Sequence, residues 1–77
     1  MKLPIVSGFE VIKLLGKIGF RHLDQHGSHV IMIKELEGRK LKPVIPLHKE
    51  LATGTLLSII KQAGLSRDEF LRLYYGK

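Results

Sequence analysis

The absence of cysteine from a chain of only 77 residues limits its fold more than any other feature of the sequence. A chain of this length is expected to form a single domain, residues 1–77, which buries roughly 60% of the surface that the extended chain exposes. It can have neither disulfide bridges nor thiolate metal ligands. Because packing alone must stabilise the fold, every helix and strand is expected to contribute to one shared core.

The first predicted element is an amphipathic helix over residues 8–18. Ser7 and Glu10 have the spacing of a capping box, which marks a helix N-terminus. The apolar residues that follow recur at the spacing of one helical face: Val11, Leu14, Leu15 and Ile18. Gly19 is placed to end this helix in a left-handed conformation.

Three antiparallel strands are predicted to follow the helix. Residues 20–25 and 28–34 read as strands joined by a turn at His26-Gly27, and Glu37-Gly38 signals a second turn. Residues 40–46 alternate in character and contain two prolines, which suits an edge strand. This alternation puts Leu41, Pro43 and Ile45 on one face and Lys40, Lys42 and Val44 on the other.

Two helices are predicted in the last third of the chain. Thr53 is expected to cap the first, which Gly64 ends. Its inward face is formed by four apolar residues: Leu56, Ile59, Ile60 and Ala63. Ser66 and Glu69 form a second capping box before a short helix whose inward residues are expected to be Phe70 and Leu73.

This order of elements predicts an α+β fold. The expected architecture is an α-β-β-β-α two-layer sandwich with a short C-terminal helix, in which the helices cover one face of an antiparallel sheet. The opposite face is then open to a ligand.

The charge balance favours a polyanionic partner. Thirteen Lys and Arg against seven Asp and Glu give a formal net charge of +6, and each phosphate that a basic surface neutralises releases counterions. A solvated surface or an acidic protein partner would also fit this charge. No apolar run approaches the roughly 18 residues that span a bilayer, and the N-terminus lacks a signal-type apolar region. We therefore expect no membrane partner and a cytoplasmic location.

Histidine is the side chain best suited to proton transfer near neutral pH, and the chain has four: His22, His26, His29 and His48. His29 follows Gly27-Ser28 at a strand start, where backbone can approach a phosphate and the Ser28 hydroxyl can donate a hydrogen bond. If Val30 and Met32 point into the core, alternation puts His29 on the open face beside Ile31 and Ile33. Spacing alone also fits a surface histidine that bonds only to its turn.

The first three histidines are close enough in sequence for a metal site to be an alternative. Their His22-x3-His26-x2-His29 spacing could supply metal ligands. However, strand alternation separates His22 from His29, and no carboxylate pair completes a ligand set. We expect no metal, and no other cofactor.

An ordered set of motifs runs along the chain: Gly19-Phe20, Gly27-Ser28-His29, Pro46-Leu47-His48, Gly54-Thr55-Leu56, the run Ile60-Lys61-Gln62-Ala63-Gly64-Leu65-Ser66, and Glu69-Phe70. Together these motifs resemble the HicA family of toxins from bacterial and archaeal toxin–antitoxin pairs, over nearly the whole chain. The resemblance implies a fold like a double-stranded-RNA-binding domain, an endoribonuclease activity on mRNA, and inhibition by a HicB-type antitoxin. It also implies that His29 is the catalytic histidine.

The resulting hypothesis is a metal-independent cleavage in which His29 acts as general base on a ribose 2′-hydroxyl. Seven residues are candidate RNA contacts: Ser28, Lys34, Arg39, Lys40, Lys42, Lys49 and Lys61. Ile31 and Ile33 are expected to contact the antitoxin, which would then also cover His29. Two alternatives stay open: an RNA-binding module of the same fold that cleaves nothing, and an interaction subunit for an acidic protein.

Overall fold

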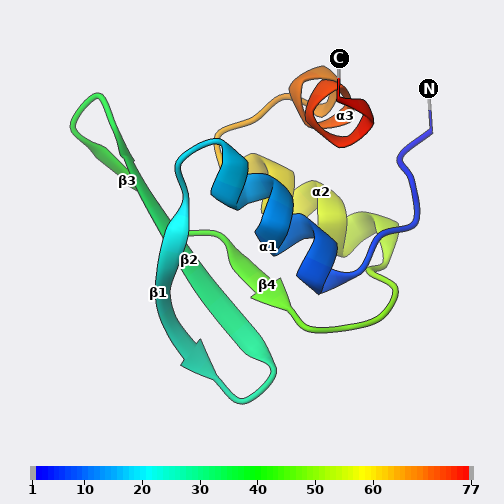
Figure 1. Cartoon of the computed structure of the whole chain (residues 1–77), viewed down its shortest axis with the longest axis horizontal. Coiled ribbons are helices and arrows are strands. Elements are labelled where there is room, and N and C mark those ends of the chain that lie inside the picture. The colour runs from blue at the N-terminus through cyan, green and yellow to red at the C-terminus, as the bar shows by residue number, and fades with distance from the viewer. Residues whose placement is uncertain (1, 77) are drawn as a thin grey trace.

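The computed structural model describes residues 2–76, in which a helix is followed by an antiparallel sheet and two further helices (Figure 1). The elements are α1 (Gly8–Lys17), β1 (Arg21–His26), β2 (His29–Leu36), β3 (Arg39–Leu41), β4 (Val44–Pro46), α2 (Thr53–Gln62) and α3 (Arg67–Tyr75). The predicted α+β class and order of elements are confirmed, and the arrangement is consistent with a fold like a double-stranded-RNA-binding domain.

The strand β2 is central in the sheet, with β1 on one side and both β3 and β4 on the other. β3 and β4 keep one register along β2, because Lys34 pairs with Leu41 and Ile31 pairs with Val44. The break between them falls at Pro43, whose carbonyl accepts the Met32 N–H at 3.1 Å but which has no N–H to return. The single edge strand predicted over residues 40–46 is therefore divided in two by one missing ladder bond.

The hairpin between β1 and β2 closes on a pair of histidines. His26 pairs with His29, so the turn consists of the two residues Gly27 and Ser28. Gly27 has φ +59°, as a type II′ turn requires at its first central residue. The turn predicted at His26-Gly27 is thus wrong by one residue, and Ser28 belongs to the turn rather than to the second strand.

A bulge interrupts the same hairpin on the β1 side. His22 pairs with Met32 whereas Asp24 pairs with Ile31, so Leu23 is an extra residue in the ladder. A bulge of this kind changes the phase of side-chain alternation along its strand.

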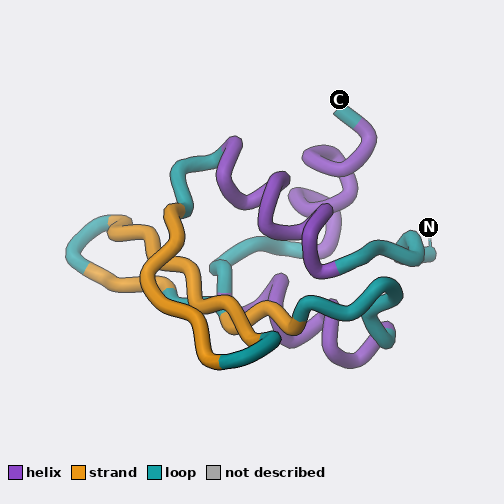
Figure 2. The backbone as a smooth tube through the Cα atoms, turned by 60° about the horizontal axis from the view of Figure 1, so that its bottom comes forward, coloured by secondary structure: helices purple, strands orange, loops and turns teal. Residues whose placement is uncertain are grey.

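The core lies between the helices and one face of the sheet. It is built from Val6, Val11, Leu15, Phe20, Val30, Met32, Leu41, Ile45, Leu51, Leu56, Ile59, Ile60, Ala63 and Phe70. The expectation that every strand contributes to it is wrong for β1, whose six residues are all exposed. The hairpin of β2 and β3 projects away from the helices in both views (Figures 1 and 2).

The start of α1 lies against the end of β4. The Gly8 N–H donates to the His48 carbonyl at 2.9 Å, and a Cβ atom at Gly8 would lie 2.9 Å from the Pro46 carbonyl carbon. The Leu47 N–H donates to the Ser28 carbonyl at 2.7 Å. The β1–β2 turn, the end of β4 and the start of α1 therefore meet at one corner of the molecule.

Both predicted capping boxes are present, at Ser7 for α1 and at Ser66 for α3. The predicted cap at Thr53 is wrong, because the N-cap of α2 is Ala52 and makes no side-chain hydrogen bond. In α3, Phe70 is buried as predicted, but Leu71 is its buried neighbour whereas Leu73 is only half-buried.

Candidate active site

His29 is the first residue of β2 and its side chain is exposed, whereas Val30 beside it is buried. Val30 and Met32 belong to the core, so alternation puts His29, Ile31 and Ile33 on the face turned away from the helices. We call this the open face. Within residues 2–76 the His29 ring makes no hydrogen bond and no ion pair, so both of its ring nitrogens are free for a ligand.

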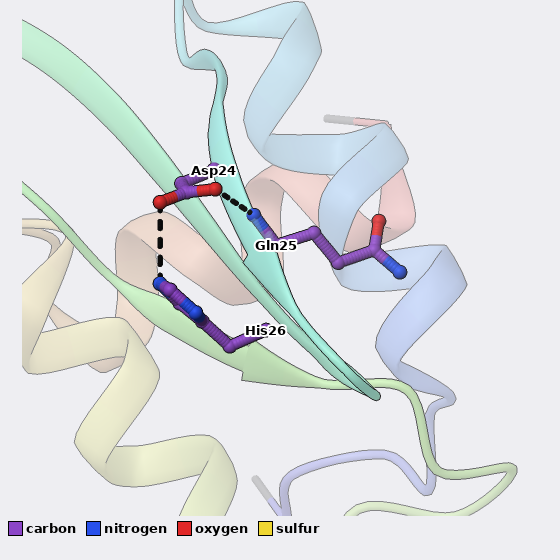
Figure 3. Close-up of polar contacts among 3 residues, drawn as sticks. All are labelled: Asp24, Gln25 and His26. Atoms are coloured by element: carbon purple, nitrogen blue, oxygen red, sulfur yellow. Dashed lines mark hydrogen bonds and ion pairs between the residues drawn. The ribbon is translucent and has the colours of Figure 1, made fainter.

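A second histidine stands directly opposite. His26 is the cross-strand partner of His29, and the Cβ atoms of such a pair lie about 4.5–5.5 Å apart on one face of the sheet. The Nε2 atom of His26 lies 3.2 Å from Oδ2 of Asp24 (Figure 3). The other carboxylate oxygen of Asp24 accepts the Gln25 N–H at 2.8 Å. Asp24 pairs with Ile31, so the carboxylate and both imidazoles share the open face.

Neither His26 nor Asp24 is among the catalytic residues predicted from the sequence. The signal that could have found them is the run His26-Gly27-Ser28-His29. A two-residue loop that begins with glycine is typical of a type II′ hairpin, and the residues on either side of such a loop pair with each other. Because the turn was predicted one residue too early, the pairing of His26 with His29 did not follow from the sequence.

The loop after β4 lies beside the same turn. The hydrogen bond from Leu47 to Ser28 ties this loop to the hairpin, and the next residues, His48 and Lys49, are exposed. Of the seven candidate RNA contacts, Ser28 lies in this turn and Lys49 lies two residues beyond Leu47 in the adjoining loop.

Two further lysines lie on the open face at a distance. Lys40 pairs with Glu35, and Lys42 stands opposite Ile33 in the same register. At about 3.3 Å per residue, these positions lie roughly 13 Å (Lys42) and 20 Å (Lys40) along the strand from His29. They are too far away to touch a group bound at the His29 side chain, but they form a basic track along the same face.

The other candidate RNA contacts lie elsewhere. Lys34 has the alternation of the core face, and its Nζ lies 5.6 Å from the centre of the Phe20 ring. Arg39 pairs with Leu36 near the tip of the projecting hairpin. Lys61 is on α2, in the layer of helices. None of these three is brought to the open face.

Apolar side chains also lie on the open face. Ile31 is half-buried and Ile33 is only 7% exposed, although Ile33 is not part of the core cluster. Val44, the cross-strand partner of Ile31, is 38% exposed. The apolar surface that a partner could reach here is therefore centred on Ile31 and Val44 rather than on Ile33.

The three histidines with metal-ligand spacing, His22, His26 and His29, do not lie on one face of the sheet. His22 pairs with Met32 and so lies on the face opposite to His26 and His29. Among residues 2–76 there is no group of three or more His, Cys, Asp or Glu side chains that could hold a metal ion. The same part of the chain has no helix with the length and apolar character needed to cross a membrane.

Comparison with known proteins agrees with the resemblance seen in the sequence. Residues 8–65 match the family described as the HicA toxin of bacterial toxin–antitoxin systems. No curated protein and no solved structure matches the chain. The match covers most of the chain, from the start of α1 to the residue before the second capping box. The chain therefore belongs to the HicA toxin family, and it is a toxin of a toxin–antitoxin system.

Proposed function

We propose that this toxin is an endoribonuclease that cleaves mRNA with His29 and is inhibited by a HicB-type antitoxin. The observation that carries the proposal is the free, exposed imidazole of His29 at a hairpin turn, on a sheet face with a basic track. Membership of the HicA toxin family supports it. The net charge of +6 also supports a partner rich in phosphate.

In this proposal a phosphodiester of single-stranded RNA lies over the β1–β2 turn. His29 removes the proton of the ribose 2′-hydroxyl, and the oxygen attacks the adjacent phosphorus to form a cyclic phosphate. Ser28 in the turn and Lys49 in the loop after β4 would bind the phosphate oxygens on which negative charge increases. DNA lacks the 2′-hydroxyl, so it would not be cleaved.

The basic track would bind the phosphates that flank the cleaved one. Lys42 and Lys40 follow one another along the open face, in the direction that leads away from His29. Contacts to phosphates fix the position of an RNA without reading its bases. We therefore expect the affinity for RNA to depend strongly on salt concentration and only weakly on the RNA sequence.

The test is incubation of end-labelled single-stranded RNA with purified protein in EDTA, beside DNA of the same sequence. His29→Ala is the test variant and His22→Ala is the matched control, since His22 is an exposed histidine on the opposite face. The wild type and the control should cleave RNA alone, and His29→Ala should be at least 100-fold slower. Equal cleavage by His29→Ala would refute the role of His29. Salt-sensitive binding without cleavage by any form would instead identify an RNA-binding module.

We further propose that the antitoxin covers Ile31 and the small exposed part of Ile33 on the open face, and that it thereby blocks access of RNA to His29. Because Val44 is the exposed partner of Ile31, the double variant Ile31→Ser, Val44→Ser should bind a HicB-type antitoxin at least 10-fold more weakly than the wild type. Leu57→Ser is the control, because Leu57 is an exposed apolar residue of α2. Unchanged affinity of the double variant would place the antitoxin elsewhere.

A further inference from the structure

The two histidines on either side of the β1–β2 turn differ in their side-chain contacts. His29 has no partner among the described residues, whereas His26, directly across the ladder, is held by the carboxylate of Asp24 (Figure 3). The His26 and Asp24 side chains are 72% and 58% exposed. An ion pair this exposed contributes little to stability, so its main effect is to orient the imidazole ring.

The orientation leaves one nitrogen of His26 available. Its Nε2 faces Asp24, so Nε2 carries the hydrogen that the carboxylate accepts and Nδ1 is the nitrogen left for a ligand. A carboxylate that fixes one ring nitrogen and leaves the other to react is a recurring arrangement in acid–base catalysis. Here the reactive nitrogen belongs to the cross-strand neighbour of the proposed general base.

We propose that His26 is the general acid of the cleavage proposed for His29, and that Asp24 is its positioning residue. This inference rests on the proposed function. His29 takes the proton of the 2′-hydroxyl while the O2′–P bond forms and the P–O5′ bond breaks. The protonated His26 gives its proton to the departing 5′-oxygen, so the products are a 2′,3′-cyclic phosphate and a 5′-hydroxyl.

The paired positions suit this division of roles. In a displacement at phosphorus the attacking and leaving oxygens lie roughly in line on opposite sides, so the base and the acid must approach the phosphate from two sides. Two side chains whose Cβ atoms are about 5 Å apart can hold a phosphate between their rings, each within hydrogen-bond reach of one oxygen. A single histidine cannot serve both oxygens in one step.

The cycle also closes without another group. After cleavage His29 carries a proton and His26 does not. When water attacks the cyclic phosphate, His26 can accept the proton of the water and His29 can return its proton to the 2′-oxygen. The P–O2′ bond then breaks, the product is a 3′-phosphate, and both histidines are restored.

The experiment uses a substrate that does not need an acid. Each oligonucleotide is DNA with a single ribonucleotide, prepared with each of the four bases, and its cleavable linkage carries either oxygen or sulfur at the 5′ bridging position. A thiolate leaves without protonation, so the sulfur linkage reports on the base alone. Cleavage rates at saturating protein are measured for the wild type, His26→Ala, Asp24→Asn and His29→Ala, with His22→Ala as the control from the opposite end of the same strand.

The expected result is a difference between the two linkages. His26→Ala should cleave the oxygen linkage about 100-fold more slowly than the wild type and the sulfur linkage within about 3-fold of it, because general acid catalysis contributes about 10²–10⁴-fold. Asp24→Asn should show a smaller loss that sulfur also restores. His29→Ala should be slow on both linkages, and His22→Ala should match the wild type.

Other outcomes separate the two proposals. If His26→Ala is slow on both linkages or on neither, His26 is not the acid, while the loss in His29→Ala still supports the proposed function. If the wild type cleaves neither linkage, the proposed function itself is overturned, and the role of His26 falls with it. Since His26 is highly exposed, its variant should unfold at the same urea concentration as the wild type, which circular dichroism checks.

Discussion

Replacement of Phe70 by alanine is expected to remove a large part of the stability of this chain. Phe70 lies on α3, beyond residues 8–65 that match the HicA family, yet its side chain is 1% exposed and belongs to the core cluster. Truncation of a buried phenylalanine costs about 3–5 kcal/mol. At about 0.05–0.15 kcal/mol per residue, a chain of this length has an unfolding free energy of about 4–12 kcal/mol. The variant should therefore lose at least a quarter of that free energy and could unfold entirely.

The assay is urea unfolding at 25 °C followed by far-ultraviolet circular dichroism. The control is Phe9→Ala, because Phe9 is a phenylalanine on α1 that is 61% exposed, and substitution there should change the unfolding free energy by less than about 0.5 kcal/mol. If Phe70→Ala loses less than about 1 kcal/mol, the reasoning is refuted, and α3 is an appendage rather than part of the core.

Three further predictions concern the surface. Glu37 has φ +52° in the β2–β3 turn, where asparagine is better tolerated, so Glu37→Asn should raise the unfolding free energy by about 0.5–1 kcal/mol; an unchanged or lower urea midpoint would contradict this. Lys42→Ala should reduce the salt dependence of RNA binding by about one unit of log–log slope, whereas Lys34→Ala, on the other face, should leave it unchanged; equal effects would argue against the basic track. The backbone N–H and the hydroxyl of Ser66, the N-cap of α3, hold the pKa of Glu69 below its usual value of 4.5. The stability that Glu69 confers is therefore present above about pH 4.5 and is lost as the pH falls through the lowered pKa. The difference in melting temperature between the wild type and Glu69→Ala should accordingly be constant from pH 7 to 5 and shrink below pH 4; a constant difference at all pH values would contradict the linkage.

Features that depend on neighbours in the sequence were predictable. The capping box at Ser7 involves residues three apart, so it marked the start of α1 correctly, and the alternation of Val30 and Met32 correctly gave the core face of β2. Features that depend on pairing across strands were not. The bulge at Leu23 is defined only by the pairing of β1 with β2, and the break at Pro43 lies where Pro43 cannot donate a hydrogen bond back to β2.

The candidate site shows the same division. The family motif and the strand alternation both pointed to His29. To predict that His26 pairs with His29, the position of the two-residue turn must be known. To predict that His26 contacts Asp24, one must know that both side chains lie on the same face of the sheet. The lysine and arginine contacts were predicted from charge, and charge does not distinguish Lys42 on the open face from Lys34 over the Phe20 ring.

The extra residue in β1 has a consequence for how this strand can vary in length. Phe20 and His26 are six residues apart, so in an uninterrupted strand they would point to the same side of the sheet. In this chain Phe20 enters the core while His26 stands on the open face beside His29, and the bulge at Leu23 makes this difference. If Leu23 were deleted, either Phe20 would have to leave the core or His26 would have to turn to the face opposite His29. A one-residue insertion or deletion here should therefore be tolerated less well than one in the projecting turn between β2 and β3.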